Sequence, residues 1–301
     1  MAEIWAPERI MTNEEAAFLI SKQFPELSHV EITKLGEGFD NTVFMVNKQY
    51  VFRFPRRTIA VKLLETESKL LPMLAEAVDT PIPVPIFIGK PGKDFPWMFI
   101  GYSLVNGITP AALSPEKRMQ SIEPLATFLK NLHAFPLENA KAAGVPYDEL
   151  GRLSIAGRKN RLQENIKKAV DGGLTNDHAR LIEYAESLKD IEIAPIYKLV
   201  HGDMHFRNLI LDSKGEMSGV IDWGDTHIGH PAVDLSIVYS FFPVEGRRQF
   251  FNIYGSVDFE TQELARFKAI YTSLLLLLYG ADLNDTELVK GAQEALNLAL
   301  L

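Results

Sequence analysis

Two carboxylates and one side-chain amide lie close together near residue 200 of this 301-residue chain. Asp203 and Asn208 precede one short apolar run, and Asp222 follows a second. The residues between the runs are typical of a tight turn, so the runs are predicted to pair as a β-hairpin. Because a hairpin brings its ends together, we expect Asn208 and Asp222 to lie side by side. The runs are Leu209–Leu211 and Gly219–Ile221, and the turn is Asp212–Gly215.

Oxygen ligands arranged in this way suit Mg²⁺, which proteins usually bind with one or two carboxylates together with substrate phosphates. Phosphoryl transfer uses that metal and also an acidic side chain that orients the attacking hydroxyl, a role that Asp203 could fill. His201 is expected to be buried and to hydrogen-bond the backbone, whereas His205 either contacts phosphate or substrate or caps the loop. Asp234 opens a later helix and is expected to accept N–H groups of this loop as structural support.

The same region could also form a different kind of metal site. Its histidines and acids could instead ligate a hydrolytic metal centre. This alternative leaves Asn208 unexplained and draws on histidines that are scattered through loops. Its ligands would be His201, Asp203, His205, Asp222, His227 and His230.

Residues nearer the N-terminus could contact the phosphates of a nucleotide. Gly36 and Gly38 separate two predicted strands, and glycines let backbone N–H groups approach a phosphate, although the same sequence also suits a plain turn. Arg53, on the third strand, either faces a ligand or is a solvated charge. Glu67 is the preferred partner for Arg53 on the following helix, and Glu65 is the alternative.

Composition limits the class of protein. A hydrophobic fraction of 47% indicates a folded chain, and a net charge of −8 argues against a duplex nucleic-acid partner. The absence of cysteine excludes disulfides and thiolate metal sites. The N-terminus lacks the pattern of a signal peptide. The longest apolar run, around Leu274–Leu278, falls short of the roughly 18 residues that span a bilayer, so a buried core helix is expected and no membrane partner.

Hydrophobic periodicity predicts an α+β fold in two lobes, with strands first and helices later. The boundary is expected near Asn106 and Gly107, and a ligand is expected in the cleft between the lobes. The predicted strands are residues 30–35, 42–46, 50–54, 84–88 and 97–104, an antiparallel five-stranded sheet. The predicted helices are residues 12–23, opened by a capping box at Thr12–Glu15, then 58–77, 117–134, 155–170, 176–188, 231–241, 245–254, 259–279 and 285–300, the last capped by Asn284.

Three segments of the chain resemble the aminoglycoside phosphotransferase family, antibiotic kinases with a protein-kinase-like fold. They are Val200-His201-Gly202-Asp203 through Asn208, then Val220-Ile221-Asp222-Trp223, then Asp234-Leu235. Gly36-Glu37-Gly38-Phe39-Asp40-Asn41 together with Phe52-Arg53-Phe54-Pro55-Arg56-Arg57 is similar to the macrolide phosphotransferases and the 2″-type aminoglycoside phosphotransferases within it.

The resemblance implies a role for each matched residue. Asp203 would be the catalytic aspartate, and Asn208 and Asp222 would be the magnesium ligands. Arg53 stands where the family usually has a lysine that contacts the α- and β-phosphates, with Glu67 as its partner. Gly36, Gly38 and Asn41 would belong to the loop over the phosphates, and Ser103 to Val105 to the hinge that bonds the base.

The expected protein is therefore a cytoplasmic, Mg²⁺-dependent small-molecule kinase that uses ATP or GTP. Residues 1–106 would form the nucleotide-binding lobe, and residues 107–301 the helical catalytic and acceptor-binding lobe. The acceptor would be a hydroxyl of a macrolide or an aminoglycoside. Asp225, Glu245 and Asp258 would suit an aminoglycoside, whereas a face with Phe241, Phe242, Tyr271 and Leu275 would suit a macrolide. The alternatives are a housekeeping kinase of choline, homoserine or a sugar, and a nucleotide-binding pseudokinase.

Overall fold

The computed structural model describes residues 7–27, 29–38, 40–110, 113–175 and 177–301. Phe39, part of the glycine-containing motif, lies outside the described residues. Contacts divide the chain into two compact units. Unit 1 comprises Met1–Glu76 and Pro81–Val105, and unit 2 comprises Ala77–Thr80 and Asn106–Leu301.

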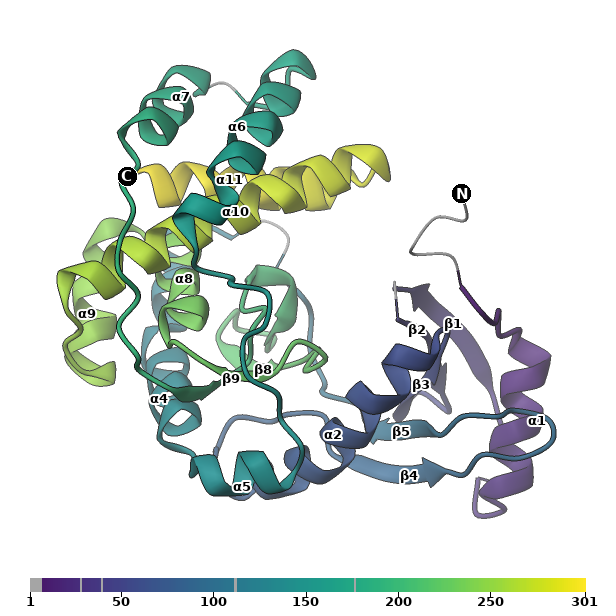
Figure 1. Cartoon of the computed structure of the whole chain (residues 1–301). Coiled ribbons are helices and arrows are strands. Elements are labelled where there is room, and N and C mark those ends of the chain that lie inside the picture. The colour runs from purple at the N-terminus through teal and green to yellow at the C-terminus, as the bar shows by residue number, and fades with distance from the viewer. Residues whose placement is uncertain (1–6, 28, 39, 111–112, 176) are drawn as a thin grey trace. The chain divides into compact units, whose positions relative to one another are not determined.

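Unit 1 is built on a five-stranded sheet in which every neighbouring pair is antiparallel (Figure 1). The strand order is β1-β2-β3-β5-β4, so the first three strands form a meander and β5 joins β3 to β4. The strands are β1 (Ile32–Glu37), β2 (Asn41–Val46), β3 (Tyr50–Pro55), β4 (Pro85–Gly89) and β5 (Phe99–Ser103), and the helices are α1 (Asn13–Gln23) and α2 (Thr58–Ala75).

The two faces of this sheet differ in chemistry because successive side chains of a strand point to opposite sides. Phe52 and Phe54 lie on one face and join α1 in an aromatic-rich core, together with Phe44, Phe99 and Phe24. Arg53, between the two phenylalanines, therefore points to the opposite face, the one that α2 covers.

Local sequence signals set the boundaries of these elements. Thr12 caps α1 with the expected capping box: its Oγ1 accepts the N–H of Glu15 at 3.2 Å, and the Glu15 carboxylate accepts the N–H of Thr12 at 3.0 Å. Asn47 and Lys48 turn β2 into β3 with φ angles of 52° and 55°. Two consecutive left-handed residues are the geometry that suits a tight hairpin.

Unit 2 is mostly helical. Its centre is α8 (Ala232–Phe241), of which every residue is buried, and α10 (Phe259–Asp282), which packs on α8 and on α11 (Thr286–Leu300) (Figure 1). The other helices are α3 (Pro115–Gln120), α4 (Ile122–Ala134), α5 (Leu137–Ala142), α6 (Ile155–Asp171), α7 (His178–Ser187) and α9 (Val244–Tyr254).

Two small sheets in unit 2 position the polar residues of the sequence motif. The expected hairpin is present as β7 (Leu209–Leu211) and β8 (Met217–Val220), with Leu209 opposite Val220. The second sheet pairs β6 (Lys198–Val200) with β9 (His227–Gly229). Each of its strands has only three residues, too few for periodicity to reveal them.

Three details of the predicted helices were wrong. The helix expected over residues 117–134 is broken at Ser121, which ends α3 and precedes α4. The cap of the last helix is Asp285, whose carboxylate accepts the N–H of Leu288 at 3.0 Å, and not Asn284, which instead takes a left-handed φ of 55°. The short helix α5 was not expected.

Helix α10 is long and apolar enough to cross a membrane by length and composition alone. However, 56% of its most apolar window is buried, and the helix packs against α6, α8 and α11. These contacts are those of the core helix that the sequence predicts. The described residues thus form the expected α+β architecture, a five-stranded antiparallel sheet followed by a mostly helical part.

Gly101 tests the packing of the unit 1 core. It lies opposite Phe52 across β3 and β5, and a Cβ at this position would approach the Phe52 ring to 2.5 Å. We expect Gly101→Ala to lower the free energy of unfolding of unit 1 by about 1–3 kcal/mol, the usual cost of overpacking. Urea unfolding followed by fluorescence measures it. Gly92→Ala is the control, because a Cβ there meets nothing within 4 Å; equal losses in both variants would contradict this account.

Candidate active site

A buried carboxylate holds the loop that carries the sequence motif of unit 2. Asp234, in the first turn of α8, is fully buried. It accepts the backbone N–H of His201 at 2.7 Å and that of Gly202 at 2.9 Å. The two amides follow β6 directly, so Asp234 fixes the path of the chain into Asp203. The structural role expected for Asp234 is confirmed.

Residues of α4 and α9 in turn hold Asp234 in place. His133 Nε2 lies 3.2 Å from the Asp234 carboxylate, and His133 Nδ1 lies 2.7 Å from the hydroxyl of Tyr254. Burial raises the pKa of Asp234, but the hydrogen bond and charge of His133, with His201 and the Gly202 amide, outweigh it and leave that pKa below its ordinary value. Asp234 is therefore an anion around neutral pH.

Gly202 is required by the shape of this loop. Its φ is +89°, and a Cβ would lie 2.1 Å from the carbonyl oxygen of Asp225 and 2.8 Å from the ring of His227. A side chain at this position would therefore be strained and would also collide with backbone. The loop that carries Asp203 consequently runs in direct contact with the segment that leads into β9.

His201 behaves as the sequence predicts, as a buried ring that shapes the loop. Its Nδ1 accepts the N–H of Asp203 at 3.3 Å, so its Nε2 carries the proton and donates to the carbonyl of Ile221 at 3.0 Å. The ring also meets Trp223 edge-on, with centroids 4.7 Å apart. His201 thereby ties the loop before Asp203 to the segment before Asp222.

The carboxylate of Asp203 sits between two polar side chains. His205 Nε2 lies 3.2 Å from its Oδ2, and the amide nitrogen of Asn208 donates to the Asp203 carbonyl at 2.8 Å and to Oδ2 at 3.4 Å. Burial raises the pKa of Asp203, yet His205, Lys268 and His201 together hold it well below the ordinary value. About a third of the side chain, 33%, stays exposed. Asp203 is therefore an accessible, ionised acceptor.

The two ends of the β7–β8 hairpin meet as expected. The N–H of Ile221 donates to the carbonyl of Asn208 at 2.9 Å, which brings the residues that flank the hairpin together. Asp222 has a φ of 65°, a left-handed conformation that non-glycine residues adopt rarely and mostly where function or local bonding demands it.

Asn208 and Asp222 provide a donor set that fits Mg²⁺. The amide nitrogen of Asn208 is taken by Asp203, which fixes the orientation of the amide and turns its oxygen away from Asp203. An amide oxygen and a carboxylate are hard ligands, and a pair of them leaves room for the water and phosphate oxygens that Mg²⁺ retains.

The hydrolytic metal alternative finds no support. Within the ranges that the structure describes, no three histidine or acidic side chains gather as metal ligands. The histidine rings are instead engaged locally: His227 Nδ1 lies 2.8 Å from the carbonyl of Asp225, and His230 Nδ1 accepts the N–H of Ala232 at 3.2 Å.

The ion pair expected in unit 1 is present. Arg53 Nη1 contacts both carboxylate oxygens of Glu67, at 2.9 and 3.1 Å. The hydroxyl of Tyr102 donates to Glu67 at 2.9 Å, and burial followed by the charge of Glu67 raises the pKa of Tyr102 well above its ordinary value. Glu65, the alternative partner, is exposed. The first candidate, Glu67, is therefore the partner of Arg53.

Gly36 lies within β1, opposite Val43, and Gly38 lies between β1 and β2; the fold demands glycine at neither position. A Cβ at Gly36 would meet nothing within 4 Å, and one at Gly38 only the Asn41 carbonyl at 3.9 Å. The turn is fixed by other contacts, since Gly38 donates to Asn41 at 2.9 Å and Arg56 donates to the Gly38 carbonyl at 2.8 Å. The Oδ1 of Asn41 is buried with no partner among the described residues.

The predicted hinge residues differ in how their backbones are used. The N–H of Ser103 donates to the carbonyl of Val84 at 3.1 Å, and the N–H of Leu104 donates to that of Gln49 at 2.9 Å. Both N–H groups are therefore already hydrogen-bonded within unit 1. Val105 is the last residue of unit 1 and is half-buried.

Only part of each acceptor surface named from sequence is available: Glu245 and Leu275 are exposed, whereas Tyr271 is buried. Phe241 and Phe242 are fully buried in the core, so they offer no face to a macrolide. Asp225 is paired with Arg152 at 2.6 Å, and Asp258 caps α10 through the N–H of Thr261 at 2.7 Å. Both acids therefore already have structural partners.

Two cationic residues near the catalytic loop escaped the sequence analysis. Arg152 bridges Asp225 and Asp148, the latter at 2.9 Å. Lys268, on α10, interacts electrostatically with Asp203 and Asp225. Burial lowers the pKa of Lys268, although Asp203 opposes that shift. No local pattern marks either residue, because their relation to Asp203 arises only when separate segments of unit 2 fold together.

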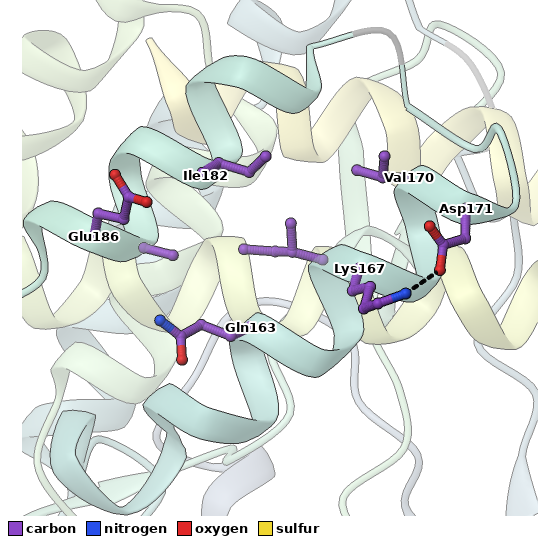
Figure 2. A pocket seen from close by; sticks show the side chains of 8 residues that line it. Gln163, Lys167, Val170, Asp171, Ile182 and Glu186 are labelled. Atoms are coloured by element: carbon purple, nitrogen blue, oxygen red, sulfur yellow. Dashed lines mark hydrogen bonds and ion pairs between the residues drawn. The ribbon is translucent and has the colours of Figure 1, made fainter.

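A separate pocket of about 290 Å³ opens between α6 and α7 (Figure 2). Ile182 and Val170 line it beside the charged pair of Lys167 and Asp171, whose atoms are 2.6 Å apart. None of the motif residues lines this pocket, so it is separate from the site around Asp203.

The buried anion Asp234 predicts a pH dependence of stability. An unfolded aspartate has a pKa of about 3.9, and the folded value is lower, so this stabilisation is complete above about pH 4 and is lost as pH falls through the folded pKa. We expect the free energy of unfolding from urea titrations to fall below about pH 4, and less steeply in Asp234→Asn. Asp171→Asn, at an exposed position, is the control; equal slopes in wild type and Asp234→Asn would contradict the assignment.

Comparison with known proteins identifies a family for the chain. The sequence model of the phosphotransferase enzyme family matches residues 31–270. The aminoglycoside 3'-phosphotransferase of Escherichia coli is 26% identical over 145 residues, 47% of this chain and 51% of that protein, so the match spans about half of the relative. The Bacillus subtilis protein YcbJ is 22% identical and the match covers 71% of this chain and 72% of that protein.

Solved structures extend the likeness to the whole chain. The GDP complex of wild-type aminoglycoside 2'-phosphotransferase-IIIa is 27% identical, with a TM-score of 0.68, and the alignment covers 96% of this chain and 99% of that one. A macrolide 2'-phosphotransferase type I shares the fold at 19% identity and a TM-score of 0.58, covering 95% and 97%. With most of its length matched by the family model, this chain belongs to the phosphotransferase enzyme family and is an enzyme of that family.

Proposed function

We propose that this enzyme transfers the γ-phosphate of ATP or GTP to a hydroxyl of a small molecule. The observation that carries the proposal is the arrangement of one exposed, ionised carboxylate, Asp203, bonded to an amide, Asn208, whose backbone joins the hairpin end that leads to Asp222. Phosphoryl transfer depends on positioning and charge stabilisation, and these groups supply both.

Asp203 would act on the acceptor. An ionised carboxylate that keeps part of its surface exposed can accept a hydrogen bond from the attacking hydroxyl and align it. His205 and Asn208 would hold the carboxylate in one orientation. The low pKa of Asp203 suits the alignment of a hydroxyl more than strong general-base removal of its proton, since a carboxylate of this kind binds protons weakly.

Asn208 and Asp222 would hold Mg²⁺, which when bound neutralises phosphate charge. The pairing of Asn208 with Asp203 would couple the metal ligand to the residue that orients the acceptor. The left-handed backbone of Asp222 would set the direction of its carboxylate.

The phosphates of the nucleotide would be bound by unit 1. Arg53, oriented by Glu67, would contact the α- and β-phosphates, and the N–H groups around Gly36, Gly38 and Asn41 would approach them. The open space at both glycines supports this role, because neither the backbone angles nor the packing requires glycine there. Ser103 and Val105 would line the base site. We place the reaction in the cytoplasm, where nucleoside triphosphates are available.

The ligands of the related structures suggest a phosphate donor and an acceptor. Two of them, both 27% identical to this chain, are complexes with GDP, and one of these also contains kanamycin. A purine nucleoside triphosphate is therefore the proposed donor. An antibiotic hydroxyl is the acceptor that those relatives suggest, and the hydroxyl of another metabolite is the alternative.

Substitution of Asp203 tests the reaction itself. We expect Asp203→Asn to fold normally but to reduce kcat for phosphate transfer by roughly 10²- to 10⁴-fold, because an amide cannot replace the charge that aligns the hydroxyl. Transfer of labelled phosphate to a panel of hydroxyl compounds measures it. Asp212→Asn, in the hairpin turn, is the control, since an amide oxygen can keep the turn contacts of Asp212. A variant with near wild-type turnover would refute the role of Asp203.

Substitution of Glu67 tests the nucleotide site. We expect Glu67→Gln to raise KM for the nucleotide by roughly tenfold, because a charge-assisted pair that orients Arg53 is lost. Glu65→Gln, two residues away on the exposed side of α2, should leave KM within roughly twofold. Steady-state kinetics with varied nucleotide separates the two. If both variants behave alike, Arg53 is not oriented by Glu67 for phosphate binding.

A further inference from the structure

Two consecutive arginines, Arg56 and Arg57, follow the last residue of β3. Their side chains are only 15% and 13% exposed. A cation that is taken out of water costs free energy unless hydrogen bonds and opposite charge replace the water. The partners of these two arginines therefore indicate what the arginines do.

The side chain of Arg56 holds the N-terminal side of the connection between β1 and β2. Its Nη1 donates to the carbonyl of Gly38 at 2.8 Å, and its Nη2 lies 3.3 Å from the carboxylate of Glu37. Arg56 is itself fixed by its backbone, because its carbonyl accepts the N–H groups of Glu8 and Arg9 at 2.9 and 3.1 Å. A planar guanidinium on a fixed backbone holds both of its partners in a defined position relative to β3.

The other side of the connection is held at Asp40. The N–H of Arg56 donates to the Asp40 carbonyl at 2.7 Å, and the guanidinium of Arg57 is paired with the Asp40 carboxylate. A trans peptide directs its C=O and its N–H to opposite sides, so the N–H of Asn41 points away from Arg56. Both described sides of the connection are thus tied to the end of β3.

The charges of the two arginines are compensated within this cluster. Glu37 and Asp40 are the acidic partners of Arg56 and Arg57. A hydrogen bond from Lys34, together with the charges of Arg56 and Lys34, lowers the pKa of Glu37 below its ordinary value, so Glu37 is ionised around neutral pH. Two cations that already face carboxylates suit the holding of the connection more than the binding of phosphate.

We propose that Arg56 and Arg57 are positioning residues that order the β1–β2 connection before the nucleotide phosphates bind. The inference rests on the proposed function, in which N–H groups of this connection approach the phosphates. A connection that the ligand must order loses conformational entropy on binding, whereas one that is already held avoids that loss. Glycine has the most conformational freedom to lose, so Gly38 makes such a clamp useful.

The clamp should affect the binding of phosphates and not of the base. Titrations with Mg²⁺ and without acceptor measure the Kd of GDP, guanosine, ADP and adenosine, and the ratio of nucleoside Kd to nucleotide Kd reports phosphate binding. Arg56→Met keeps the aliphatic stem and removes the hydrogen bond to Gly38 and the contact with Glu37. We expect it to lower this ratio roughly 5- to 30-fold, the entropy of ordering about one residue, and to leave the nucleoside Kd within about twofold.

Asp40→Ala separates a clamp from direct phosphate binding, because it keeps both arginines and removes the acidic partner of Arg57. The clamp predicts weaker nucleotide binding in this variant. Arginines that contacted phosphate themselves would give tighter binding, since a cation would be released. Tighter binding would overturn the inference.

Arg9→Met is the matched control. The guanidinium of Arg9 also donates to a backbone carbonyl of unit 1, that of Asp94 at 2.6 Å, and lies over the ring of Phe95, while its backbone N–H is unchanged by the substitution. Its ratio should equal that of wild type.

The remaining outcomes distinguish the inference from the proposed function. A ratio in Arg56→Met equal to that of wild type would overturn the inference and leave the proposed function intact. An equal loss of nucleoside and nucleotide binding would do the same, since the substitution would then disturb the whole nucleotide site. A wild-type protein that binds neither GDP nor ADP would overturn the proposed function and this inference with it.

Discussion

The structure of the loop that carries Asp203 depends on one buried anion. Asp234 accepts two consecutive backbone amides, those of His201 and Gly202, and is fully buried beneath them. Buried charge is tolerated only where hydrogen bonds and opposite charge replace water, and the two amides and His133 do so here. Because the amides immediately precede Asp203, the position of the Asp203 carboxylate follows from the position of α8. A fully buried helix thus supports an acid that stays partly exposed.

The first unit uses the same arrangement with different residues. Glu67 is buried and receives Arg53 and the hydroxyl of Tyr102, so α2 orients a cation on β3. In both units a carboxylate on a helix fixes a polar group on a strand or at its end. The packing of a helix against strands therefore fixes the position of Arg53 in unit 1 and of the loop before Asp203 in unit 2.

The features that the sequence predicted are those encoded locally. The capping box of α1, the β7–β8 hairpin and the pairing of Asn208 with the far hairpin end follow from residues a few positions apart. Sequence spacing alone does not separate Glu67 from Glu65 as the partner of Arg53. The two differ in burial, since Glu67 is buried within unit 1 and Glu65 is exposed. Features that depend on distant segments were missed or wrong: the three-residue pairing of β6 with β9, the burial of Phe241 and Phe242, and the approach of Lys268 to Asp203. No local pattern encodes such encounters. The cap of α11 was assigned to Asn284 for another reason. Both Asn284 and Asp285 are residue types that suit an N-cap, and only their backbone angles show that Asp285 is the cap.

The bridge made by Arg152 has a consequence for how such enzymes diverge. It joins Asp148 to Asp225, and the backbone of Asp225 abuts Gly202, so a substitution in either loop also disturbs the chain that leads into Asp203. By contrast, the described contacts of Lys268 hold up no part of that loop. A substitution at Lys268 can therefore change the charge near Asp203 without disturbing the backbone of this loop, whereas a substitution at Arg152 changes both.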